Sequence, residues 1–252
     1  MADRRAGRQS RAAVVGLALL AIVPMLAKPC GGSSLEGVAG WEGDRDAQGY
    51  GFLTMGTAPA QGARWSVPVR VTGSYLYYEY ETGGNEIGVR APGVGGLLGL
   101  RLSGARGSLA VLVGGEGRWE RRWSSGSAAS AAVARGGVVA QGEATFAIGK
   151  RLRPFLLANY SGSARYIYSR AELPLQLTNL DWSGPVALFA GLEGAVQGNA
   201  DTDATQIGGS VGCSFTKSRI SLGVHGGSKE SRSAEGTRKT GTYFGVSLYR
   251  RF

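Results

Sequence analysis

The feature that most constrains this chain is an alternation of apolar and polar side chains, with a period of two residues, that recurs along most of the sequence. It is clearest in the last stretch, residues 240–252, where the apolar set is interrupted only by Arg250. A period of two is typical of a β-strand with one apolar face. Alone, such a strand fits the edge of a soluble sheet as well as a membrane barrel, so the rest of the chain must decide.

The same stretch ends on an aromatic residue, Phe252. The closing strand of a bacterial outer-membrane barrel commonly ends in this way, and residues 240–252 resemble that signal. We therefore predict an assembly signal on the outward face of a closing strand. Its residues are Phe244, Val246, Leu248 and Phe252.

The N-terminus has the three-part layout of a secretory signal peptide. Residues 1–11 are basic, residues 12–27 are apolar, and small and polar residues follow to position 34. We predict a signal peptide over residues 1–30, cleaved between Ala27 and Gly32, followed by a barrel domain over residues 31–252. A membrane anchor fits less well because the apolar core is short and contains a proline. Lipidation of Cys30 is the other alternative, although the residues before it match a lipidation signal poorly.

Beyond residue 34, alternating stretches recur twelve times. They are residues 35–43, 49–57, 64–80, 89–102, 108–123, 137–149, 153–169, 172–180, 185–197, 205–216, 219–227 and 240–252. The connections between them sort by length, because the three longest all fall at one end of the predicted sheet. They are residues 81–88, 124–136 and 228–239. An even strand number with short turns at one end is typical of bacterial outer-membrane barrels. The sequence therefore predicts an all-β fold, a transmembrane antiparallel up-and-down β-barrel of about twelve strands.

The composition supports strands rather than helices as the membrane-crossing elements. Charged residues make up 18% of the chain, and no apolar run after residue 30 approaches the length of about 18–20 residues that a membrane helix needs. Lipid cannot hydrogen-bond free backbone groups, so a sheet in the bilayer must close on itself. Aromatic residues near the strand ends are expected to form an interfacial girdle, although each one also fits the core of a soluble sandwich. They are Trp41, Trp65, Tyr75, Tyr77, Trp119, Trp123, Tyr166 and Tyr168.

Charge and cysteine content argue against several other classes. The formal net charge is +10, but the positive residues are scattered rather than clustered as in a nucleic-acid-binding surface. The chain has two distant cysteines and a single histidine, which does not fit any common metal-ligand spacing. We therefore predict no nucleic-acid partner, no metal and no cofactor.

The predicted inward face carries a set of charged residues. They are Arg70, Arg101, Glu116, Arg118, Glu120, Arg122, Glu143, Arg165 and Glu193. Such charges form either a polar path for a ligand or a plug of ion pairs, and we favour the plug because charges in a narrow lumen must be paired. Catalysis is disfavoured because no Gly-X-Ser-X-Gly elbow comes with a second histidine partner, and the single histidine, His225, is predicted to point into the lumen. Lumen acids beside arginines also more often stay ionised and structural. No catalytic residue is predicted.

Several short phrases resemble the BcsS-type cellulose-biosynthesis family of outer-membrane proteins. They are Ala91-Pro92-Gly93, Gly115-Glu116-Gly117-Arg118, Gln141-Gly142-Glu143, Asn159-Tyr160-Ser161, Arg165-Tyr166 with Tyr168 and Arg170, Gly191-Leu192-Glu193 followed by Gln206 and Gly208, and Asp44-Arg45-Asp46 before Tyr50. The resemblance covers nearly the whole mature chain, roughly residues 36–252, and the order of the phrases along the chain is its strongest signal. The sequence departs from the family pattern at Gly115, where a proline is expected, and in the Gly/Ala-rich residues 125–134.

This resemblance implies an association with cellulose production or export. Together with the alternation and the signal peptide, it predicts a non-enzymatic barrel of the bacterial outer membrane that is associated with cellulose (exopolysaccharide) biosynthesis or export. The expected partners are outer-membrane lipid, the barrel assembly machinery, and cellulose synthase or export components or the polysaccharide itself. The alternatives are a general small-solute porin or structural barrel and, less favoured, a barrel enzyme that acts on lipid or glycan.

Overall fold

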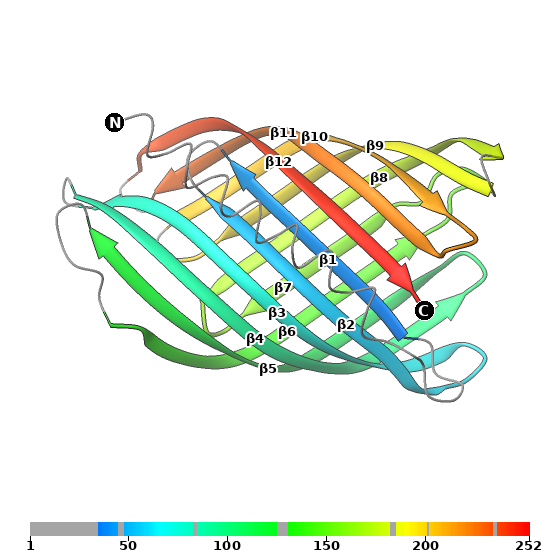
Figure 1. Cartoon of the computed structure of the whole chain (residues 1–252), viewed down its shortest axis with the longest axis horizontal. Helices are drawn as coiled ribbons and strands as arrows, with labels where there is room; N and C mark the ends of the chain where they lie inside the picture. The colour runs from blue at the N-terminus through cyan, green and yellow to red at the C-terminus, as the bar shows by residue number, and fades with distance from the viewer. Residues whose placement is uncertain are drawn as a thin grey trace.

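A computed structural model describes residues 35–44, 48–82, 85–124, 131–181, 185–200, 202–233 and 236–252. The predicted signal peptide and Cys30 lie outside these residues. In the described chain, twelve antiparallel strands run obliquely around a closed barrel (Figure 1). They are β1 (Leu35–Asp44), β2 (Gly49–Gln61), β3 (Trp65–Thr82), β4 (Asn85–Gly104), β5 (Gly107–Ser124), β6 (Val133–Phe146), β7 (Phe155–Ser161), β8 (Tyr166–Asp181), β9 (Pro185–Gly198), β10 (Thr202–Phe215), β11 (Ile220–Ser233) and β12 (Arg238–Arg251). The predicted fold class and strand number are confirmed. No helix in this part of the chain is long and apolar enough to cross a membrane.

The barrel closes where the first strand pairs with the last. β1 and β12 lie side by side in Figure 1, in a register that runs from Glu36 opposite Arg251 to Asp44 opposite Tyr243. The backbone N–H of Phe252 extends this seam by donating to the carbonyl of Leu35 at 2.8 Å. Closure leaves no open sheet edge, as a strand surrounded by lipid requires. We call the end of the barrel where β1 begins and β12 ends the terminal end, and the opposite end the far end.

Successive side chains point alternately out of the barrel and into its lumen. The outward positions of the middle of each strand are mostly large and apolar, and they are exposed to an extent that is unusual for a soluble protein: Leu192 is 70% and Ile207 is 72% exposed. Similar outward residues are Val71, Val94, Leu98, Leu100, Leu109, Val111, Val113, Val138, Leu156, Leu173, Val211 and Phe244. A continuous apolar belt of this size is typical of a lipid-facing surface rather than of the core of a soluble sandwich.

Aromatic residues border the belt on β3. Trp65 lies at the terminal end, opposite Leu102, and Tyr75 lies about ten residues further along the same strand, opposite Pro92. At a tilt of about 40°, ten residues of strand rise roughly 25 Å along the barrel axis, which matches the apolar band of a membrane barrel. Beyond Tyr75, the rings of Tyr77 and Trp123 stack at 6.0 Å.

The structure corrects the predicted boundary between the seventh and eighth strands. The sequence predicts one strand over residues 153–169 and a turn at residues 170–171, whereas β7 ends at Ser161 and β8 begins at Tyr166. The four-residue turn between them holds Arg165 at a positive φ of 49°. Because Ser161 and Tyr166 are paired, the turn reverses the phase of the alternation, so Tyr166 and Tyr168 point into the lumen. Their predicted place in the outward girdle is therefore wrong.

The predicted sorting of connections by length is also wrong. Two segments predicted as long loops belong largely to strands. β3 extends to Thr82 and β4 begins at Asn85, and likewise β11 extends to Ser233 and β12 begins at Arg238. At the terminal end, the connection over residues 147–154 is longer than expected. The far-end extensions are polar on both faces, which resembles a loop in sequence, because they stand beyond the apolar belt.

We expect deletion of Phe252 to impair assembly, because it removes the seam hydrogen bond to Leu35 and an aromatic ring that stacks under Arg250 at 4.5 Å. The folded fraction in outer-membrane extracts should fall, as measured by heat-modifiable migration on denaturing gels. Phe215→Ala, which removes a partly exposed aromatic ring at the terminal end of β10, away from the seam, is the matched control. Equal folded fractions for the two variants would contradict the assembly role.

Candidate functional site

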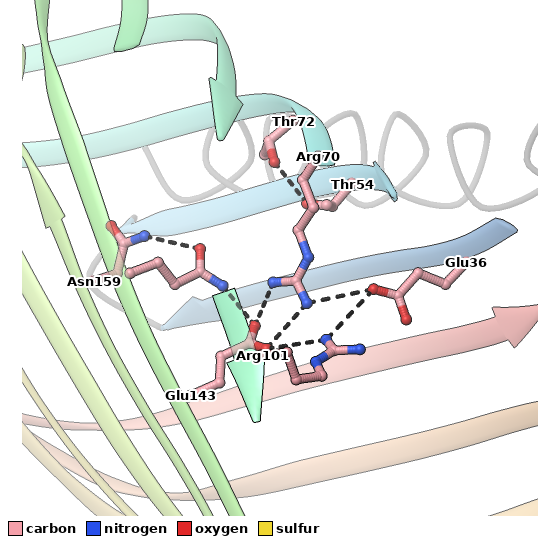
Figure 2. A network of polar contacts seen from close by, with 8 residues as sticks. Glu36, Thr54, Arg70, Thr72, Arg101, Glu143 and Asn159 are labelled. Atoms are coloured by element: carbon pink, nitrogen blue, oxygen red, sulfur yellow. Dashed lines mark hydrogen bonds and ion pairs between the residues drawn. The ribbon is translucent and has the colours of Figure 1, made fainter. Parts of the chain in front are cut away.

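The terminal half of the lumen is crossed by a network of ion pairs centred on Arg70 of β3 (Figure 2). The guanidinium Nη2 of Arg70 donates to Glu143 Oε2 at 3.0 Å and to Glu36 Oε1 at 3.4 Å. Arg101 Nη2 lies 3.7 Å from the same Glu36 oxygen and 3.6 Å from Glu143 Oε2. Two arginines and two glutamates therefore alternate in a neutral ring.

This ring connects nearly opposite walls of the barrel. Glu36 is on β1 and Glu143 is on β6, five strands apart around a barrel of twelve. Gln141 donates to Glu143 at 2.7 Å and accepts a hydrogen bond from Asn159 at 3.3 Å, which extends the network to β7. We call these six residues, Glu36, Arg70, Arg101, Gln141, Glu143 and Asn159, the terminal layer. Because Arg70 is buried, its positive charge needs the two carboxylates that the layer supplies.

A second group of contacts fixes the β7–β8 turn to β5. The carboxylate of Glu116 accepts hydrogen bonds from the hydroxyls of Ser161 and Ser163, and from the backbone N–H of Ser163 at 3.3 Å. Arg118 lies 3.5 Å from the same carboxylate and donates to the carbonyl oxygen of Ala91 at 3.0 Å. These bonds hold the chain reversal at residues 162–165, which the sequence pattern alone does not reveal. We call Glu116, Arg118, Ser161 and Ser163 the β5 cluster.

A third group, the opposite cluster, consists of Glu42, Arg170, Glu172, Glu193, Gln206, His225 and Tyr243. Glu193 of β9 accepts from Arg170 Nη2 and from the hydroxyl of Tyr243, both at 2.5 Å. Glu42 of β1 accepts from Gln206 Nε2 at 2.6 Å and lies 3.4 Å from His225 Nε2. These contacts link β1, β8, β9, β10, β11 and β12 across the lumen.

Two glycines make room for this cluster. A Cβ atom on Gly245 would lie 2.1 Å from His225 Nε2, and one on Gly208 would lie 2.4 Å from the Tyr243 hydroxyl. The imidazole therefore lies over β12 to reach Glu42, and the phenol lies over β10 to reach Glu193. A side chain at either glycine would displace the group that rests on it.

The predicted lumen residues thus belong to separate groups. Arg70, Arg101 and Glu143 share the terminal layer, Glu116 and Arg118 share the β5 cluster, and Glu193 belongs to the opposite cluster. Glu120 lies toward the far end, where it pairs with Arg122 and with Arg135 at 3.4 Å. Arg165 does not line the lumen from a strand; its side chain is exposed, because it is the last residue of the β7–β8 turn.

Sequence analysis missed several members of these groups. The missed residues are Glu36, Glu42, Arg170, Glu172, Gln206 and Tyr243. Their polar type at inward positions was the available signal, but the partners of Glu36, Glu42 and Tyr243 lie two or three strands away around the barrel. The predicted lumen position of His225 is correct, but its partner Glu42 was not foreseen. Among the described residues, no group of His, Cys, Asp and Glu side chains could hold a metal ion.

We expect Arg70→Met to lower the free energy of unfolding by about 2–4 kcal/mol, because it leaves Glu36 and Glu143 with only the more distant and more exposed Arg101 as a shared cation. Adding Glu143→Gln should recover part of the loss, with a coupling energy of about 1–3 kcal/mol in a double-mutant cycle measured by urea unfolding in lipid vesicles. Arg238→Met is the matched control, because its 3.5 Å pair with Glu230 is exposed and should contribute less than about 1 kcal/mol. Equal losses for the two arginine variants would contradict this assignment.

Comparison with known proteins supports the fold. No curated protein matches the chain. The β domain of the Bordetella autotransporter BrkA aligns over 87% of this chain and 98% of its own length, with a TM-score of 0.50 and 11% identity. An outer membrane channel from Pseudomonas putida F1 aligns over 90% of this chain and 97% of its own length, with a TM-score of 0.51 and 12% identity. At these identities, the likeness extends to the barrel fold alone.

The family is shown by the sequence itself. The pattern described as cellulose biosynthesis protein BcsS matches residues 36–252, which take in the whole barrel except the first residue of β1. The resemblance predicted from the short phrases is confirmed. The chain belongs to the cellulose biosynthesis protein BcsS family.

Proposed function

We propose that this chain is a non-enzymatic barrel of the outer membrane that serves cellulose biosynthesis or export. The observation that carries the proposal is the combination of a lipid-facing apolar belt with a lumen crossed by a neutral ring of ion pairs, in a chain of the BcsS family. The apolar belt is suited to a lipid environment, and membership of the BcsS family supports a role in cellulose biosynthesis.

The outer membrane is the proposed location because closed barrels of this kind are how bacterial chains cross that membrane. In this proposal, the terminal end faces the periplasm and the far end faces the outside. The barrel assembly machinery would then recognise the closing strand, and cellulose synthase or export components would be its partners on the periplasmic side.

A non-enzymatic role is proposed because the lumen acids already have structural partners. Glu116 accepts hydrogen bonds from two serines, Glu143 binds Arg70, and Glu193 binds both Arg170 and Tyr243. A general acid for sugar hydrolysis needs a carboxyl that is free to give up a proton to the substrate. Acids engaged with arginines are poorly suited to that work.

The terminal layer also argues against a general small-solute pore. Passive diffusion through a barrel needs a continuous water-filled path, whereas Arg70, Glu36 and Glu143 bridge β1, β3 and β6. A barrel of twelve strands is narrow enough for side chains to obstruct it.

We expect a strain that lacks this gene to carry less cellulose on the cell surface, while isolated inner membranes keep their glucan-synthesising activity. Surface cellulose would be measured by dye binding and by glucose release after cellulase treatment. Complementation with Glu116→Gln, Glu143→Gln or Glu193→Gln should restore cellulose whenever the variant assembles, because no turnover is lost.

Unchanged surface cellulose in the deletion strain would overturn the cellulose role. Recovery of the protein in the soluble periplasm would overturn the membrane role. A glutamine variant that assembles normally and abolishes cellulose would instead indicate catalysis.

A further inference from the structure

The far end of the lumen holds a small recess above the opposite cluster. Its volume is about 50 Å³. Aromatic and amide side chains line it, chiefly Tyr50, Tyr78, Tyr166, Gln48, Gln197 and Asn199. Glu42 and Lys229 also reach it, so its floor joins the ion-pair network below.

Two aromatic walls face each other across this recess. Tyr50 is on β2 and Tyr166 is on β8, six strands apart in a barrel of twelve, which places them on opposite sides. Tyr50 stacks on Phe52 at 5.8 Å, and Tyr166 donates its hydroxyl to Gln197. Tyr50 nevertheless keeps 38% of its surface exposed, so part of this wall is open to a ligand.

The charges at the recess are already compensated within the chain. Lys229 Nζ donates to Asp44 Oδ2 at 2.7 Å and to Gln48 Oε1 at 2.9 Å. The carboxylate of Glu42 accepts from Gln206 and lies beside His225. A neutral ligand therefore fits this site better than a phosphorylated or anionic one, which would need an unpaired cation.

A saccharide matches this combination of groups. The C–H face of a β-linked glucose packs on an aromatic ring. Its hydroxyls can accept hydrogen bonds from the amide N–H groups of Gln48 and Gln197, whose oxygens already accept from Lys229 and Tyr166. The recess is too small for a whole sugar ring, because its volume corresponds to only a few water molecules. A terminal sugar could rest on Tyr50 at the rim and insert a hydroxyl or hydroxymethyl group, while the lumen below stays filled.

We propose that the far-end recess binds the terminal sugar of a neutral β-linked glucan, so that the barrel holds the polymer at its mouth rather than conducting it. This inference rests on the proposed role in cellulose biosynthesis, which supplies such a glucan at the cell surface. Neutral sugar could also come from lipopolysaccharide, whose core is phosphorylated, so the test includes both sources.

The test measures binding by the full barrel in lipid nanodiscs. Calorimetric titration with cellotetraose should give saturable binding, and neither the α-linked maltotetraose nor a phosphorylated core oligosaccharide should compete. Absence of cellotetraose binding to the wild-type barrel would overturn the inference. Preference for the phosphorylated core would also overturn it, because the recess is argued to select a neutral sugar.

Variants locate the binding site. Tyr50→Ala should weaken cellotetraose binding by about three- to tenfold, while Tyr50→Phe should retain it because the stacking face remains. Tyr249→Ala is the matched control: this tyrosine also points inward and is 36% exposed, but it lies at the terminal end. Equal weakening by Tyr50→Ala and Tyr249→Ala would overturn the assignment to the far-end recess.

The same variants separate this inference from the proposed function. A strain that carries Tyr50→Ala should secrete normal total cellulose but retain less of it on the cells than the Tyr249→Ala strain. If deletion of the gene lowers surface cellulose and Tyr50→Ala restores it to the wild-type level, the assignment to the recess fails and the proposed function stands. If deletion has no effect but Tyr50-dependent binding is measured, the proposed function fails and the site stands.

Discussion

The constraint on which this structure depends is that lipid offers no hydrogen-bond partner to a backbone amide. Each strand must therefore pair on both sides, and the pairing of β1 with β12 completes the ring. Closure at twelve strands gives a narrow lumen, in which polar side chains must find partners inside the barrel. The apolar belt outside and the ion-pair network inside are two consequences of the same closure.

The network is distributed unevenly along the barrel axis. At the terminal end, Arg70 bridges carboxylates on nearly opposite walls, and in the middle the β5 cluster and the opposite cluster occupy facing arcs of the wall. Toward the far end, a recess lined by tyrosines and amides remains. This difference between the two ends favours a barrel that binds a ligand at its far end over a barrel that conducts a polymer along its axis.

The fold could be predicted from the sequence to the extent that it depends on local alternation. The strand number, the outward apolar faces and the closing strand follow from a period of two. The β7–β8 turn could not be predicted, because Ser161 and Ser163 continue the alternation and the reversal depends on Glu116, far away in sequence. The site was predicted only as a set of inward charges. Its division into groups depends on the register of strands up to five apart, which single-strand patterns do not encode.

The central claim is that the terminal layer closes the lumen, and ion conductance through single barrels in a planar bilayer tests it most directly. The account predicts no steady conductance for the wild-type barrel. It predicts a steady current when Glu36, Arg70, Arg101 and Glu143 are all replaced by serine, in protein that still migrates as a folded barrel. A wild-type barrel that conducts steadily, at the same level as the serine variant, would contradict the account.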